Sequence, residues 1–262
     1  MRSSSVMNPR IRVAHLGQSG FRLAVEETVI YIDPYLSDSV ERAEGPSFRR
    51  LRPLPIAPSS ITDASAVLVS HIHGDHCDHD TILPLARSSP QCRFLGPRAV
   101  IESLRAAGLE AAKTIVLNVD PVRLSGDVLV HPIPAAHKEI ETDEAGFLRY
   151  LGFVLECGGK RLLHTGDSRV HESIVAKVRD IGPIDVAFLP VNECNFYRDQ
   201  AGIVGNMSVR DAFRLAEDLH AEVVVPMHYD MFAANQTYAE EIQLIYDKTR
   251  PSFRLAFDPR EI

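Results

Sequence analysis

Five short apolar segments of this chain each run into a loop that carries an aspartate or a histidine. The segments and the residues that follow them are Thr28–Ile32 with Asp33, Ala66–Ser70 with His71, Val128–Val130 with His137, Arg161–Leu163 with Asp167, and Val223–Val225 with His228. Apolar runs of this length, rich in branched side chains, are typical of buried strands. Loops at the ends of such strands gather along one edge of a layered α/β fold. The pattern therefore predicts one site built from Asp and His residues far apart in sequence.

Helical spacing separates several of these predicted strands. It occurs at Arg98–Ala107, at Glu172–Arg179, in a stretch beginning at Ser208, and at Tyr238–Tyr246. Ser208 begins the sequence S-V-R-D, which resembles a helix-capping box. Strand pairs interleaved with helices predict an α/β layered fold with sheets inside and helices outside. The sequence has no tandem repeat and no Gly/Ser linker, so we expect residues 1–262 to form one domain.

Composition narrows the partners of such a fold. The chain has 28 Lys and Arg against 35 Asp and Glu, a formal net charge of −7, which argues against a nucleic-acid partner. This balance does not exclude a small anionic substrate held by metal or by a few positive groups, and we expect a small-molecule substrate. The segment MRSSSVMNPR lacks the apolar core of a secretory signal, and the sequence has no apolar run of membrane-spanning length. Four separated cysteines without a C-x-x-C pair predict reduced thiols in a cytoplasmic protein: Cys77, Cys92, Cys157 and Cys194.

The most specific motif is H-x-H-x-D-H at residues 71–76, directly after a predicted buried strand. In an extended segment His71 and His73 point to the same side. Gly74 lets the chain turn, so that Asp75 and His76 can face a second position nearby. The motif thus offers two ligands to one metal ion and two to a neighbour. Nitrogen and carboxylate ligands without thiolate suit Zn²⁺, Mn²⁺ or Fe. A solvated polar loop is the alternative, and it is less consistent with this spacing.

Four residues follow this motif directly. We expect Cys77 to pack as a small apolar residue rather than to bind metal. His79 and Asp80 are expected to open the following helix or to support the ligands from behind. Asp78 is a candidate for holding a ligand in place without touching the metal.

Two histidines compete for the third ligand of the first ion. His131 and His137 both lie in the segment HPIPAAH, which its prolines keep extended. The spacing alone does not separate them. His164, at the end of another predicted strand, is expected to be a buried hydrogen-bonding residue.

At this point several motifs resemble a known family. HIHGDH at 71–76, the AAH segment ending at His137, HTGDS around Asp167 and VVPMHYD around His228 resemble the ordered motifs of the metallo-β-lactamase fold superfamily. The upstream HLGQSGF and VIYIDPYLSDS, which contains Asp33, are similar to its opening strands. The late segment GNMSVRDAFRLAEDLHAEVVVPMHYDMF resembles the L-ascorbate-6-phosphate lactonase branch of metal-dependent hydrolases.

The resemblance implies a four-layer αββα sandwich with a dinuclear site at the edge loops. It implies two divalent metal ions per chain, Zn²⁺ or Mn²⁺. The ligands implied are His71, His73 and His137 for the first ion, Asp75, His76 and His228 for the second, and Asp167 as a bridge between them. Asp33 would orient ligands without touching metal. The resemblance also implies a homo-oligomer.

The implied reaction is hydrolysis of a lactone or an ester. Two ions about 3.5–4 Å apart would share a water, lower its pKa toward neutrality and so provide a hydroxide that attacks the carbonyl. Asp75 is the candidate proton shuttle to the leaving oxygen. Asn192, Arg198 and Asn206 lie in a polar segment and are candidates for substrate contacts.

Two other functions remain possible for such a metal site. A phosphodiesterase acting on a small phosphodiester would use the same pair of ions. A di-iron redox protein on the same scaffold is less consistent with the sequence, because such sites tend to use more carboxylates and these ligands are mostly histidines.

Overall fold

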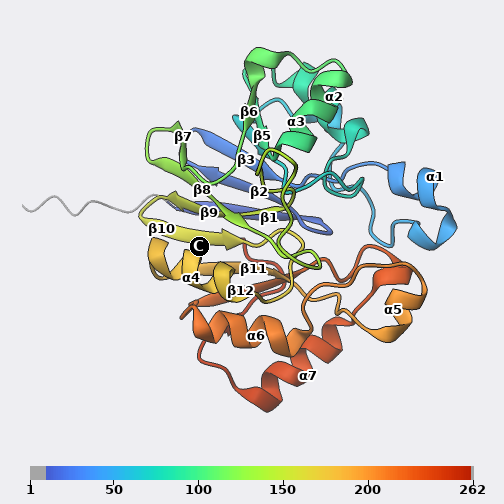
Figure 1. Cartoon of the computed structure of the whole chain (residues 1–262), viewed down its shortest axis with the longest axis vertical. Helices are drawn as coiled ribbons and strands as arrows, with labels where there is room; N and C mark the ends of the chain where they lie inside the picture. Colours follow the sequence, from blue (N-terminus) through green and yellow to red (C-terminus); the bar gives the residue numbers. More distant parts are fainter. Residues whose placement is uncertain (1–9, 261–262) are drawn as a thin grey trace, which may run out of the picture.

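The computed structural model of the chain describes residues 10–260, and the N-terminal segment considered above lies almost wholly outside this range. Two mixed β-sheets pack face to face, and helices cover the outer face of each (Figure 1). This arrangement confirms the predicted αββα sandwich. None of the helices between residues 10 and 260 combines the length and the apolar composition of a membrane span.

The first sheet holds the N-terminal strands in chain order. These are β1 (Ile11–Gly17), β2 (Gly20–Val25), β3 (Thr28–Ile32), β4 (Ala66–Leu68), β5 (Arg93–Gly96) and β6 (Thr114–Val116). The strands β1 to β3 form an antiparallel meander, whereas β3 to β6 are parallel. The parallel half places the ends of β3 and β4 side by side, which brings the loops that begin at Asp33 and Val69 together.

The second sheet has the same mixed character. Its strands are β7 (Val122–Ser125), β8 (Val128–Pro134), β9 (Leu151–Cys157), β10 (Lys160–His164), β11 (Val186–Pro190), β12 (Val223–Met227) and β13 (Arg254–Leu255). The strands β7 to β10 are antiparallel and β10 to β13 are parallel. The loops after β10 and β12 therefore leave the same edge of this sheet.

The helices form the two outer layers and the rim. They are α1 (Ser39–Glu44), α2 (His79–Ser88), α3 (Arg98–Ala106), α4 (Glu172–Ile181), α5 (Phe196–Gln200), α6 (Val209–Asp218) and α7 (Ala239–Thr249), with short 3₁₀ turns η1 (Pro46–Phe48), η2 (Pro58–Ser60), η3 (Ala111–Lys113) and η4 (Ala233–Asn235). Figure 1 shows α2 and α3 outside the first sheet, and α4, α6 and α7 outside the second. The short helices α1 and α5 lie together at one side.

The core lies between the two sheets. Phe21 of β2 and Phe188 of β11 meet there with ring centroids 4.4 Å apart, and both are fully buried. Contacts of this kind join the sheets because each strand turns alternate side chains inward. Burial of this large apolar interior provides the rigid frame that holds the loops at the sheet edges.

The helices predicted from spacing are present with small shifts at their ends. The capping box at the start of α6 is confirmed, with Ser208 and Asp211 bonded to each other's backbone. The helix expected from His79 is α2, and it continues through Pro84. The strand expected to end at Val130 instead continues to Pro134, as β8. Its prolines are tolerated because this part of β8 pairs with β9 and extends past the residues of β7.

Candidate metal centre

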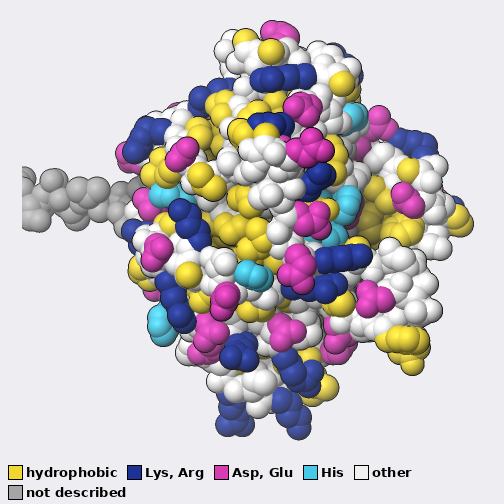
Figure 2. Space-filling view, viewed as in Figure 1, with side chains coloured by type: hydrophobic (Ala, Val, Ile, Leu, Met, Phe, Trp, Pro, Cys, Tyr) yellow, Lys and Arg dark blue, Asp and Glu magenta, His cyan; other side chains and the backbone are white. Residues whose placement is uncertain are grey.

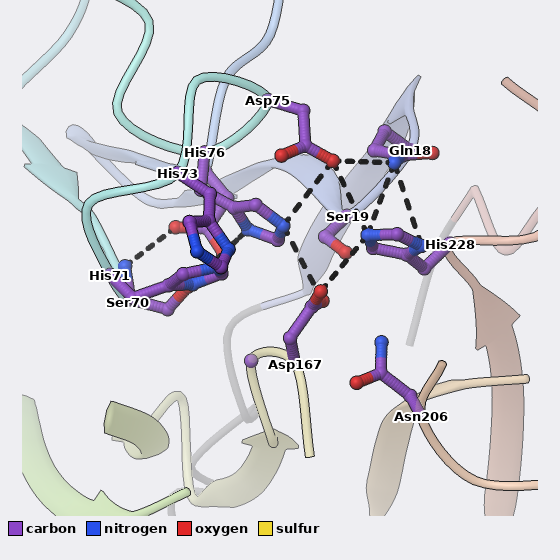
Figure 3. A network of polar contacts seen from close by, with 12 residues as sticks. Gln18, Ser19, Ser70, His71, His73, Asp75, His76, Asp167, Asn206 and His228 are labelled. Atoms are coloured by element: carbon purple, nitrogen blue, oxygen red, sulfur yellow. Dashed lines mark hydrogen bonds and ion pairs between the residues drawn. The ribbon is translucent and has the colours of Figure 1, made fainter. Parts of the chain in front are cut away.

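Loops from both sheets bring the predicted ligands to one edge of the sandwich. Figure 3 shows the side chains from 71–76 facing Asp167 and His228, which come from the other sheet. The potential ligand atoms form three groups in which all atoms lie within 4.8 Å of one another: His71, His73 and His137; His71, His76 and Asp167; and Asp75, His76 and His228. The first and third groups have the same membership as the two predicted sets of metal ligands.

The first group, here called the histidine triad, is His71, His73 and His137. Nε2 of His71 lies 2.9 Å from Nδ1 of His73, and the ring of His137 is 4.8 Å from that of His73. The ring of Tyr150 packs against His137 at 4.8 Å and against His71 at 5.4 Å. Tyr150 was not expected from the sequence, since it stands outside the recognisable motifs. Its ring limits how far the histidine rings can rotate.

The second group, here called the mixed triad, is Asp75, His76 and His228. Nε2 of His228 lies 3.3 Å from Oδ2 of Asp75, and Nε2 of His76 lies 3.7 Å from the same oxygen. All three point at a common position (Figure 3). Two imidazoles and one carboxylate form a donor set that suits a divalent transition-metal ion.

Asp167 lies between the two triads. Its Oδ1 is 3.4 Å from Nε2 of His76, and its Oδ2 is 3.1 Å from Nε2 of His228 and 3.9 Å from Nε2 of His137. One carboxylate thus faces a histidine of each triad. This position is the one that a bridging ligand would need.

The hydrogen-bonding state of the centre tests whether a cation fits. Nε2 of His76 and Oδ1 of Asp167 are buried, and neither has a hydrogen-bond partner. Buried polar atoms without partners are costly, so they usually mark a missing ligand. Because these atoms converge with further imidazole and carboxylate groups, the residues fit divalent metal ions.

Asp33 fixes the orientation of two of the histidines. Its carboxylate accepts hydrogen bonds from Nδ1 of His76 at 2.8 Å and from Oγ of Ser70 at 2.6 Å. Ser70 in turn lies 3.0 Å from Nδ1 of His71. With both Nδ1 atoms acting as donors, Nε2 of each ring is left as a lone-pair donor. Asp33 thus contacts the ligand set in the way predicted, without belonging to any of the three groups.

Gln18 is a further member of the site that was not expected from the sequence. It follows β1 and is buried, and its Nε2 donates to Oδ2 of Asp75 at 2.7 Å. The same amide lies 3.1 Å from Nε2 of His228. A glutamine in a short turn gives little sequence signal, because turns are commonly polar for reasons unrelated to function.

The backbone is strained at three site residues. Gln18, Asp33 and His228 have φ angles of 54°, 42° and 59°, in the left-handed region that non-glycine residues seldom occupy. Each such residue costs on the order of 1 kcal/mol or more, and such strain is frequent at functional sites. Here it directs three side chains into one centre.

A chain of buried amides backs His228. Asn206 donates to Asn192 at 2.9 Å, Asn192 donates to Asn235 at 3.0 Å, and the amide of Asn235 lies 3.3 Å from Nδ1 of His228. If Nε2 of His228 serves as a ligand, Nδ1 carries the proton and needs an acceptor. The oxygen of Asn235 supplies one when its amide is rotated by 180°. Asn235 was not expected from the sequence.

The three residues proposed to contact substrate make hydrogen bonds within the chain, and Asn206 is drawn on the side of the centre that holds Asp167 and His228 (Figure 3). Asn192 and Asn206 are buried in the amide chain, and they are not among the residues that line the cavity beside the centre. Arg198 donates to the backbone carbonyls of Glu193 and Gln236, at 2.7 Å and 2.9 Å. These hydrogen bonds hold the surrounding loops, whereas Oδ1 of Asn206 is buried without a partner, and the contact of the three side chains with substrate stays a prediction.

Four further expectations concerned residues near the motif. Asp78 caps α2 and accepts from Ser39 and Thr81, so its hydrogen bonds hold the helix rather than a candidate ligand. Cys77 is buried in an apolar cluster, as predicted, and burial raises the pKa of its thiol to about 12. The four cysteines are free thiols. The expected helix start at His79 is confirmed.

The competition between His131 and His137 has a clear structural outcome. Nε2 of His131 faces Oε1 of Glu156 at 3.3 Å on the neighbouring strand, away from the candidate ligands. His137 joins the histidine triad. His164 is fully buried and lies 2.9 Å from the carbonyl of Ser19, which confirms its expected role as a hydrogen-bonding residue.

The electrostatics of the site depend on burial and on its carboxylates. Burial lowers the pKa of His71 well below its ordinary value, and it lowers the pKa of His137 to about 4, so both imidazoles are neutral and available as ligands. Burial would also lower the pKa of His228, but Asp167 and Asp75 raise it to about 9. Burial would raise the pKa of Asp75, but His76 and His228 hold it well below its ordinary value.

Fold and site together define a class of protein: a sandwich of two mixed sheets that gathers histidines and aspartates at one edge, as in the metallo-β-lactamase fold. Residues 28–229 match the family described as the Beta-lactamase superfamily domain. The chain belongs to this family.

Known relatives extend the comparison. The protein named "Probable L-ascorbate-6-phosphate lactonase UlaG" of Escherichia fergusonii is 26% identical over 223 residues, which cover 80% of this chain and 61% of that protein. The chain thus matches less than two thirds of that relative's length. Among solved structures, Igni18, a metallo hydrolase from Ignicoccus hospitalis, has a TM-score of 0.69 at 19% identity, with 97% of each chain covered. An isothiocyanate hydrolase from Delia radicum gut bacteria has a TM-score of 0.72 at 14% identity, with 96% of this chain and 98% of that chain covered. At these identities the structures share the fold.

Proposed function

We propose that the protein is a metal-dependent hydrolase of lactones or carboxylic esters that uses two divalent ions. The single observation that carries the proposal is the position of Asp167, whose two oxygens face His76, His137 and His228 across 3.1–3.9 Å. The histidine triad would hold one ion and the mixed triad the other, with Asp167 in contact with both. The relative named as a lactonase favours a carbonyl substrate over a phosphodiester.

Zn²⁺ and Mn²⁺ are the ions proposed. When bound, such ions lower the pKa of a water and polarise a carbonyl oxygen. The chain itself orients the ligands: Asp33 and Ser70 fix the rings of His71 and His76, and Gln18 holds one oxygen of Asp75.

Asp75 is the proposed proton carrier. Oδ2 of Asp75 makes its contacts with Gln18, His76 and His228, whereas Oδ1 takes part in none of them (Figure 3). In the proposed step, water adds to the carbonyl carbon, and the bond from that carbon to the leaving oxygen breaks. One proton of the water passes through Oδ1 to the leaving oxygen. Because the pKa of Asp75 is low, the carboxylate holds this proton only briefly.

A side-by-side assay tests the reaction class. Protein loaded with Zn²⁺ or with Mn²⁺ is given a γ-lactone, an aryl ester and a bis-aryl phosphate at equal concentrations. We expect turnover of the lactone or the ester, and loss of that turnover in Asp167→Asn. Turnover of the phosphodiester alone would contradict the proposal and favour the phosphodiesterase.

A further inference from the structure

A cavity of about 520 Å³ opens beside the candidate metal centre, with Asp75, His137, Asp167 and His228 among its lining residues. It lies on the side of the molecule where α1 and α5 form the rim. In Figure 2 hydrophobic side chains fill the hollow on that side, next to histidines. The apolar residues that line the cavity away from the centre are Val40, Ala43, Phe48, Ile203, Val204 and Phe232.

One wall of this cavity is a packed aromatic cluster. The ring of Phe48 meets the ring of Phe232 edge to face at 5.6 Å, and Phe232 meets Tyr35 in the same way at 5.8 Å. Phe232 and Tyr35 are buried, and Val40 packs against them. Because these rings support one another, the wall keeps its apolar surface without a ligand present.

The segment after α5 forms another part of the lining. Ile203 and Val204 are both half-buried there and line the cavity. A substrate whose carbonyl sits at the metal centre would place its remote part in the cavity that Phe48 and Ile203 both line.

The charged side chains other than histidine that line the cavity are all acidic. Among the described residues that line it, none is Lys or Arg, and five are Asp or Glu; Asp75 and Asp167 belong to the candidate metal centre, and Glu44, Asp78 and Asp80 do not. The arginines nearest in sequence are already engaged: Arg42 pairs with Asp80, and Arg49 pairs with Glu41 at 2.8 Å. Arg50 donates to the carbonyl of Tyr35 at 2.9 Å and lies over its ring. Its Nε and Nη2 are buried without a hydrogen-bond partner, but Arg50 is not among the residues that line the cavity.

A phosphate on the remote part of a substrate would fit this cavity poorly. An anion moved from water to an apolar wall loses its hydration and needs a cationic partner in return. An alkyl or aryl group is stabilised in the same place, and each methylene buried there strengthens binding about fourfold.

We propose that this protein hydrolyses uncharged lactones or esters whose remote substituent is an alkyl or aryl group, and that it discriminates against substrates phosphorylated at that end. This inference rests on the proposed function and deepens it. The substrate proposed here differs from the phosphorylated lactone in the name of the Escherichia fergusonii relative. Phe48 and Ile203 are the proposed specificity-determining residues.

A series of γ-lactones tests the proposal with metal-loaded protein. The substrates are γ-valerolactone, γ-heptalactone and γ-nonalactone, which carry methyl, propyl and pentyl groups, together with L-ascorbate 6-phosphate. We expect kcat/KM to rise at least about tenfold from the methyl to the pentyl lactone, and the phosphorylated lactone to be the poorest substrate. Calorimetry with the matching pentyl and methyl γ-lactams gives a readout independent of turnover, and the pentyl lactam should bind more tightly.

Two variants test whether Phe48 and Ile203 cause the preference for the longer alkyl group. Phe48→Ala and Ile203→Ala should each lower kcat/KM for the pentyl lactone about tenfold while changing the methyl lactone less than about twofold. Leu244→Ala removes an exposed leucine of α7 that does not line the cavity, and it should change neither. Thermal unfolding midpoints check that each variant folds.

The outcomes separate this inference from the proposed function. If every lactone and ester is inert with both metals loaded, the proposed function fails. If the methyl and pentyl lactones react equally well, or the phosphorylated lactone reacts fastest, the hydrolase proposal stands and the apolar specificity is wrong.

Discussion

The carboxylate of Asp33 lies 2.8 Å from Nδ1 of His76, and both side chains are completely buried. The same carboxylate also accepts the hydroxyl of Ser70, which contacts His71. One residue outside the candidate ligand set therefore sets the ring orientation of one histidine in each triad. Partners of this kind commonly change metal affinity 10- to 100-fold when they are removed.

Asp33→Asn is accordingly expected to weaken metal binding about 10- to 100-fold, because the amide loses the charge that favours two donor Nδ1 atoms. Chelator competition measures the affinity. Asp63→Asn is the matched control, since Asp63 sits at the surface and pairs with Arg22. Equal affinities for the two variants would show that Asp33 does not orient ligands.

Replacing the two competing histidines should have opposite results. His137→Ala is expected to lose about one metal equivalent, because His137 belongs to the histidine triad. His131→Ala is expected to keep the full metal content, since His131 faces Glu156. Elemental analysis of the folded variants gives the answer, and the reverse pattern would overturn the ligand assignment.

The amide of Asn235 offers a third prediction. Asn235→Leu removes the acceptor needed by Nδ1 of His228 and should lower metal affinity about 10- to 100-fold. Asn235→Asp keeps an acceptor oxygen at the same place and should restore most of that affinity. A comparable loss in both variants would mean that the residue acts only through packing.

Protons should compete with metal at His228. In the metal-free protein burial would lower the pKa of His228, but Asp167 and Asp75 raise it to about 9. A ligand imidazole must be neutral, so the ion held by the mixed triad displaces the proton of His228 when it binds below this pH. Apparent metal affinity should therefore fall as the pH is lowered from 9 to 7, by up to about tenfold per pH unit for one proton. Calorimetry at pH 7 in buffers of different ionisation enthalpy should detect the released proton, whereas a buffer-independent heat would contradict this.

Much of the centre could be predicted because its residues follow apolar segments that are recognisable in the sequence as buried strands. The spacing of His71, His73, Asp75 and His76 after β4 is local. The strand-end pattern singled out His137, Asp167 and His228, and the resemblance to a known family assigned their roles as ligands. The residues that were missed act at long range. Gln18 and Asn235 contact the site only because distant loops meet there, and neither residue type is diagnostic of a metal centre.

The hydrogen bonds of the predicted substrate residues depend on the fold. Asn192, Asn206 and Arg198 lie in a polar segment of the sequence, and folding engages Asn192 and Asn206 with other amides and Arg198 with backbone carbonyls, so their contact with substrate stays a prediction. Strand β8 continues past its expected end at Val130 to Pro134. Its prolines are tolerated because the residues after Val130 have no partner in β7. The short strands β5, β6, β7 and β13 were not predicted, because they have too few residues for a clear alternation of apolar and polar side chains. The one-domain organisation, the cytoplasmic location and the homo-oligomer stay predictions.

The two triads are proposed to hold a pair of metal ions, with Asp167 shared between them. The most direct measurement is a crystal structure of Zn²⁺-loaded or Mn²⁺-loaded protein with anomalous diffraction data at the metal edge. We expect two peaks per chain, one among His71, His73 and His137 and the other among Asp75, His76 and His228, with the carboxylate of Asp167 touching both ions. A well-folded protein that shows no peak, or one peak only, would contradict this proposal.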